Sequence, residues 1–92
     1  KNIFCGIAAK DGSDVTVKNV FFNNTEIPFA SYNKKTFYDP PVLKINNNFS
    51  VKNFKKIYLK DVNSKIIVNR KDIKNVNKHV YNIIYKKDLN LL

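Results

Sequence analysis

Hydrophobic and polar residues alternate in short runs along most of the chain, and this pattern is clearest in residues 6–20. There Val15 and Val17 alternate with polar residues, which is typical of a strand that buries one face. The preceding residues 11–14, Asp-Gly-Ser-Asp, are typical of a tight turn, because glycine tolerates positive φ and short polar side chains bond to nearby amides. The stretch therefore predicts a strand, a turn and a second strand.

Parts of this stretch recur later in the chain with the same order of apolar and polar residues. Residues 6–9 match residues 28–31, which lie 22 positions later, and residues 11–17 match residues 62–68, which lie 51 positions later. Repeats of this length indicate units that stack and bury their apolar residues on one another. The apolar residues that we expect in one shared core are Val15, Val17, Leu43, Ile45, Ile66 and Val68.

The spacing of apolar residues changes near the end of the chain. Val76, Val80, Ile83 and Ile84 fall three, four and seven positions apart, which places them on one face of a helix. We expect this helix to run from about residue 75 to residue 86. It would cover the open end of the stacked strands, where strand edges are otherwise unpaired.

The chain also resembles a known family. The residues that carry the resemblance are Gly6, Ile7, Ala8, Ala9, Lys10, Asp11, Gly12, Ser13, Val15, Val17, Asn19, Ala30, Tyr32, Lys34, Lys35, Phe37 and Pro40. With the tail that runs from Asn77 to Lys87, they resemble the right-handed parallel β-helix domain of bacterial surface and secreted proteins. The most similar version is the one that follows the kinase-like domain of spore-coat protein H relatives. Tyr38 and Asp39 stand where that family usually has glycine after the phenylalanine.

The repeats and the resemblance together predict the fold class. It is all-β, a short right-handed parallel β-helix of about three partial rungs in residues 1–73, closed by a C-terminal α-helix and tail in residues 74–92. The length of 92 residues fits one domain with a modest core. Because the chain starts at Lys1 within a strand pattern, we expect it to be the C-terminal part of a longer protein.

The charge of the chain is strongly positive. It carries 17 Lys and Arg residues against 7 Asp and Glu residues, for a net charge of +10, and Arg70 is the only arginine. Eleven of the cations lie in the second half, and nine of these form the candidate stripe: Lys52, Lys55, Lys56, Lys60, Lys65, Arg70, Lys71, Lys74 and Lys78. They are consistent with a stripe that binds a polyanion, or with a solvated face in a proteome rich in lysine. Such a lysine-dominated surface is a poor match to sequence-specific reading of bases, which usually relies on arginine.

The best candidate for a ligand site is the loop that precedes Pro40. Its residues are Tyr32, Lys34, Lys35, Phe37 and Tyr38. Lysines beside aromatic rings can hold an anionic ligand or a sugar by charge and stacking. The alternative is that the aromatic rings pin the loop to the stacked strands and that the lysines only keep it solvated.

Other residues with reactive side chains give weaker signals. Cys5 is the single cysteine, so no disulfide forms within the chain, and its apolar neighbours predict a buried structural thiol. His79 lies at the edge of the apolar face of the predicted helix and is expected to be partly buried. The acids Asp11, Asp14, Asp39 and Asp61 would suit calcium only if they converged, so no metal site, cofactor or catalytic residue is predicted.

Three functions remain open at this level. The first is a non-enzymatic structural or display end of a β-helix domain in a surface or secreted bacterial protein, as the resemblance implies. It would contact upstream rungs, or a second copy of the chain, through an N-terminal edge that includes Ile3, Phe4 and Ile7. The second is a basic module that binds an anionic polymer, either a cell-wall polysaccharide or a nucleic acid. The third is the terminal part of a carbohydrate-active β-helix enzyme whose active site lies upstream.

Overall fold

The computed structural model describes residues 3–35, 37–46, 48–77, 80 and 83–84. The strands within those residues are β1 (Ile3–Lys10), β2 (Asp14–Lys18), β3 (Phe21–Asn23), β4 (Thr25–Tyr32), β5 (Val42–Asn46), β6 (Ser50–Lys52), β7 (Tyr58–Lys60), β8 (Lys65–Val68) and β9 (Lys71–Asp72). They form three sheets with the orders β1-β4-β7, β2-β5-β8-β9 and β3-β6, which we call the first, second and third sheets. In the described part of the chain, no helix is long and apolar enough to cross a membrane.

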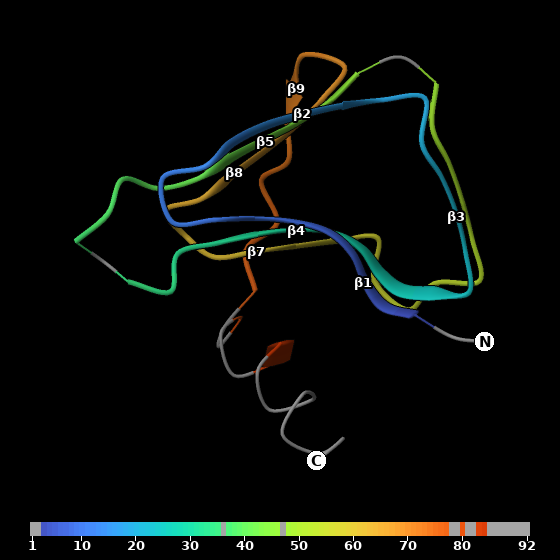
Figure 1. Cartoon of the computed structure of the whole chain (residues 1–92), viewed down its shortest axis with the longest axis horizontal. Coiled ribbons are helices and arrows are strands. Elements are labelled where there is room, and N and C mark those ends of the chain that lie inside the picture. The colour runs from blue at the N-terminus through green and yellow to red at the C-terminus, as the bar shows by residue number, and fades with distance from the viewer. Residues whose placement is uncertain (1–2, 36, 47, 78–79, 81–82, 85–92) are drawn as a thin grey trace.

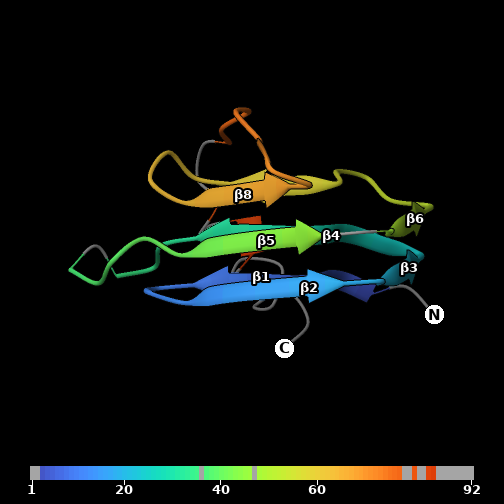
Figure 2. The same ribbon diagram turned by 90° about the horizontal axis from the view of Figure 1, so that it is seen from above.

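The chain passes through the three sheets in the same order twice, and a third passage reaches the first and second sheets; we call each passage a circuit. The first circuit is residues 3–23, the second is residues 25–52, and the third is residues 58–68. Successive circuits pair through parallel strands. Seen along the shortest axis, the three sheets outline a triangle (Figure 1), and the view from above shows the circuits as layers (Figure 2).

The register of the repeats was predicted from the sequence and is confirmed. In the second sheet, Val15 pairs with Leu43 and Leu43 with Ile66. In the first sheet, Ile7 pairs with Phe29, as the match of residues 6–9 with residues 28–31 requires. The period-two pattern fixes this register, because a slip of one residue would turn every apolar side chain outward.

The main core lies between the three sheets. Its buried residues are Ala9, Phe29, Leu43, Ile45 and Ile66, and Val15, Val17 and Val68 pack against them. Phe29 is at the centre, where its ring meets Phe22 and Phe49 edge to face and stacks on Tyr58. Burial also raises the pKa of Tyr58 above its ordinary value of 10.0. The core therefore joins residues from all three circuits.

The predicted right-handed β-helix closed by a C-terminal α-helix is wrong. The sheets stay open, and the second sheet is mixed, because β9 runs antiparallel to β8. The cause is the turn at Asn69 and Arg70, whose φ angles are 48° and 72°. Two successive positive φ angles are the geometry of a tight β-hairpin, which sends the chain back along β8. Within the described residues, the third circuit consequently adds no strand to the third sheet.

The C-terminal stretch also differs from the prediction. Residues 75–77 have no regular structure, and residues 78–79, 81–82 and 85–86 of the predicted helix lie outside the described residues. The isolated positions Val80, Ile83 and Ile84 have helical backbone geometry, but no helix is among the elements of the described residues.

The expected docking position of this stretch needs correction as well. Val80 and Ile84 are buried, but in a second core with Ile27, Ala30 and Leu59 of the first sheet. They therefore cover the outer face of that sheet rather than the end of the stack. The other two positions of the expected apolar face, Val76 and Ile83, are exposed.

Candidate functional site

The loop between β4 and β5 is held in place by acids from other circuits. Asp11, in the first circuit, accepts a hydrogen bond from the Lys35 amide at 2.9 Å. Asp61, in the third circuit, accepts one from the Asn33 amide at 2.8 Å. The Asp39 carbonyl accepts another from the Gly12 amide at 2.6 Å. Hydrogen bonds to main-chain groups therefore hold this loop, while the rings of Phe37 and Tyr38 are exposed.

The five predicted site residues have different positions in this loop. Tyr32 is buried in the second core, so its ring is not available to a ligand. Lys34, Lys35, Phe37 and Tyr38 are exposed. Phe37 is 77% exposed, and its ring centroid lies 4.5 Å from that of Tyr38. The structure therefore places four of the five on one exposed loop, at the left corner of the triangle in Figure 1.

Two of the acids that were considered as calcium ligands form hydrogen bonds with backbone amides instead. Asp11 and Asp61 accept bonds from loop amides, and Asp61 also accepts one from the Ser64 amide at 3.0 Å. In the described part of the chain, no group of three or more His, Cys, Asp or Glu side chains could hold a metal ion. Asp11 and Asp61 thus stabilise loops through hydrogen bonds from backbone amides, which is a common role for this side chain.

A second candidate site, which sequence reasoning missed, lies at the corner where the second sheet ends. Lys18 ends β2 and pairs with Asn46, which ends β5. Asn69 follows β8, and its amide donates to the Ile45 carbonyl at 2.9 Å, so it is the next member of the same row. With Arg70 these residues line a hollow of about 300 Å³, which we call the basic corner.

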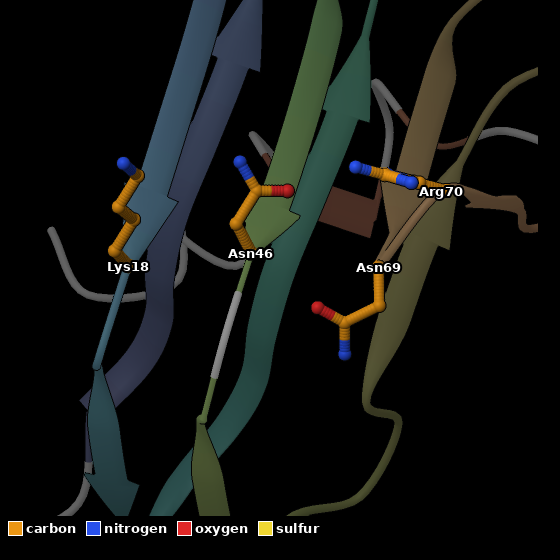
Figure 3. Close-up of a pocket in the computed structure, with 4 residues that line it drawn as sticks. All are labelled: Lys18, Asn46, Asn69 and Arg70. Atoms are coloured by element: carbon orange, nitrogen blue, oxygen red, sulfur yellow. The ribbon is translucent and has the colours of Figure 1, made fainter.

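The residues of the basic corner come from the ends of two strands and from the turn that follows a third. Figure 3 shows Arg70 extending toward Asn46, while Lys18 stands on the other side of Asn46. Among the described residues, neither cation of this corner has a carboxylate within ion-pair distance, whereas Lys55 is paired with Glu26 at 3.0 Å. The corner thus offers two unpaired positive charges and two amides, each of which can donate and accept hydrogen bonds.

The sequence did contain a signal for this corner. Lys18, Asn46 and Asn69 each follow by one residue the aligned positions Val17, Ile45 and Val68. The repeat alignment that predicted the core therefore also implies this row. The row was not predicted, because the basic residues of the second half were considered as one stripe. Lys60 does not belong to such a stripe, since it is 6% exposed.

Two further residues with reactive side chains, Cys5 and His79, were considered in the sequence. Cys5 is half-buried against the second core, so the expectation of a buried thiol is correct only in part. It belongs to the first circuit, where no further strand lies beyond β1 in the part of the chain that the structure describes. His79 lies outside the described residues.

The two ends of the stack differ in how their strand edges are covered. At the third circuit, β9 pairs with the edge of β8. Asn77 bonds to the edge of β7, where its amide donates to the Lys60 carbonyl at 2.9 Å. At the first circuit, β1, β2 and β3 are each the outermost strand of their sheet within the described residues. We call this end the open end and treat it as a candidate interaction surface.

Comparisons with known proteins do not extend these observations. The relationship to spore-coat protein H relatives stays a prediction from the sequence. The chain matches no family model, no curated protein and no solved structure.

Proposed function

We propose that the protein is a non-enzymatic structural module that joins a second copy of itself through the open end. The observation that carries this proposal is the contrast between the two ends of the stack. β9 and Asn77 cover the edges of β8 and β7, so that within the described residues only β6 of the third sheet is left without a covering strand or bond next to it at that end. At the open end β1, β2 and β3 all have strand partners on one side only in the described structure. Edge strands that natural proteins leave uncovered are templates for pairing with another chain.

The burial of aligned apolar residues also supports the open end as the contact surface. In the second circuit Phe29, Leu43 and Ile45 are completely buried. Their counterparts in the first circuit, among them Ile7 and Val15, are only half-buried. The first circuit thus keeps apolar area in water that a further layer would cover, at about 25 cal/mol for each Å² removed from water.

Charge indicates that the further layer is a second copy. Within residues 3–24, Lys10 and Lys18 are offset by Asp11 and Asp14, so the net charge of +10 lies elsewhere in the chain. Two copies of a strongly basic protein repel one another through most of their surfaces. The neutral open end is the face at which this repulsion is smallest.

A two-fold axis gives this contact a simple geometry. Symmetric dimers use the same patch on both subunits, and across the axis β1 would run antiparallel to β1 of the second copy. β1 and β4 are the longest strands of the described residues, with 8 residues each, and β4 already lies between β1 and β7. β1 is therefore the longest strand at the open end.

Charged substitutions at exposed positions of the open end test this proposal. Ile3 and Phe21 are 51% and 60% exposed, so the double variant Ile3→Lys/Phe21→Lys should fold normally. Lysine on an edge strand opposes pairing with another chain. Light scattering after size exclusion should give about twice the chain mass of 10.7 kDa for the natural sequence at roughly 100 µM, and the single chain mass for the variant.

A matched control changes the same number of charges elsewhere. Phe54 and Val62 are 43% and 73% exposed and lie after the second circuit, so Phe54→Lys/Val62→Lys should leave the dimer intact. If the natural sequence ran as a single chain at this concentration, or if the control dissociated as fully as the open-end variant, the proposal would be wrong.

A further inference from the structure

We infer that the basic corner binds an anionic sugar unit of an acidic polysaccharide. The site consists of Lys18, Asn46, Asn69 and Arg70, around a hollow of about 300 Å³. It does not depend on association through the open end, because its four residues come from one chain.

The register of the second sheet sets the size of the site. Lys18, Asn46 and Asn69 occupy one row across β2, β5 and the end of β8. Neighbouring strands lie about 4.8 Å apart, so this row spans roughly 10 Å. That length accommodates one or two sugar rings, with a cation near each end of the row and amides between them.

The chemistry of the lining matches an acidic sugar. The Arg70 guanidinium can hold a carboxylate or a sulfate by two parallel hydrogen bonds, and Lys18 adds a second positive charge. The amides of Asn46 and Asn69 both donate and accept, as sugar hydroxyls require. Carboxylated and sulfated sugars share this chemistry, and the experiment below separates them.

The backbone of Arg70 gives independent support. Its φ angle is 72°, in the left-handed region that residues with a Cβ seldom adopt. Glycine is the residue that the second position of such a turn prefers. Residues held in unfavourable backbone conformations cluster at functional sites. Arg70 thus has a long cationic side chain at a position where glycine would be easier to accommodate.

The same lining disfavours a nucleic acid. Proteins that bind single strands stack bases on aromatic rings, and none of the four lining residues is aromatic. The exposed ring pair of Phe37 and Tyr38 lies in the loop between β4 and β5, at a different corner of the triangle (Figure 1). An acidic polysaccharide needs charge and hydrogen bonds without stacking, and the basic corner supplies both.

Titration of the natural protein and its variants tests this inference. The probes are a heparin-derived oligosaccharide, an oligogalacturonate and an oligothymidylate, each at low and at moderate salt. Calorimetry should detect binding of at least one of the two sugar probes. The double variant Lys18→Gln/Arg70→Gly should weaken that binding by tenfold or more, which corresponds to roughly 1.4 kcal/mol or more.

Two controls separate loss of the site from loss of charge or fold. Lys52→Gln/Lys56→Gln removes two exposed cations at another corner and should weaken binding by less than about twofold. Arg70→Gly alone should weaken binding while raising the melting temperature by roughly 2–5 °C, because it relieves the strained turn. A loss of affinity that accompanies a rise in stability cannot result from unfolding.

Three results would overturn the inference. The first is no binding of either sugar probe at low salt. The second is an equal loss of affinity in Lys18→Gln/Arg70→Gly and Lys52→Gln/Lys56→Gln, which would indicate unspecific attraction to a basic protein. The third is tighter binding of the oligothymidylate than of both sugars, which would assign the corner to a nucleic acid.

Discussion

Replacing Phe29 with alanine is expected to lower the free energy of unfolding by about 3–5 kcal/mol, which is enough to unfold most small domains. Phe29 is completely buried in the main core. Its ring lies 5.6 Å from that of Phe22, 5.7 Å from that of Phe49 and 6.1 Å from that of Tyr58, between ring centroids. Because these neighbours come from all three circuits, the cavity would weaken the packing between every pair of layers. Urea unfolding followed by circular dichroism measures the loss.

A second phenylalanine provides the control for this prediction. Phe54 is 43% exposed, so Phe54→Ala should cost less than about 1 kcal/mol. If Phe29→Ala were no more destabilising than Phe54→Ala, the main core would not be centred on Phe29, and the account of packing between circuits would fail.

Replacing Gly6 with alanine is expected to cost about 3 kcal/mol, although only one methyl group is added. A Cβ at this position would lie 2.6 Å from the Pro28 carbonyl oxygen and 2.8 Å from Cζ of Phe22. The oxygen belongs to the backbone of β4, and the Phe22 ring is held against Phe29, so neither can move without shifting the core. The midpoint of urea unfolding, with an unchanged slope, measures this cost.

The other glycine of the chain separates crowding from backbone strain. Gly12 has a φ of 72°, but a Cβ there would meet nothing closer than the Asp39 carbonyl oxygen at 3.8 Å. Gly12→Ala should therefore cost only the 1–2 kcal/mol, roughly, of a left-handed residue with a Cβ. A larger loss for Gly12→Ala than for Gly6→Ala would show that β4 and the Phe22 ring do not approach Gly6 as closely as described.

The layered arrangement was predictable from the sequence because its cause is local and repeated. The alternation around Val15 recurs around Leu43 and Ile66, and a parallel register follows once the three copies are aligned. The same alignment placed Lys18, Asn46 and Asn69 in one row, so the position of the basic corner was accessible as well.

The hairpin after β8, at the covered end of the stack, was not predictable in the same way. The reversal at Asn69 and Arg70 depends on positive φ in a turn without glycine, and the sequence does not display that preference. Asn19, Asn24 and Asn53 also have positive φ, at bends between strands. Asparagine tolerates this conformation better than most residues. Its abundance, which codon usage in an AT-rich genome could also explain, therefore has a structural role at these bends.

Residue types alone did not predict which residues of the candidate loop are accessible to a ligand. Lys34, Lys35, Phe37 and Tyr38 are exposed as the site hypothesis requires, yet Tyr32 faces the second core. Which side a residue at a strand end faces depends on the twist and bend of that strand. The residues before Tyr32 in β4, Phe-Ala-Ser, show no alternation that would indicate the side. The loop itself is fixed by Asp11 and Asp61, which are distant in sequence.

The central claim is that the open end pairs with a second copy, and amide hydrogen exchange at two protein concentrations tests it most directly. Exchange in β1 should slow as the concentration rises from about 5 µM to about 500 µM, because bound partners protect the amides that face away from β4. Exchange in β8 and β9, at the covered end, should not change. Equal exchange rates in β1 at both concentrations, or slowing in β8 and β9 instead, would contradict it.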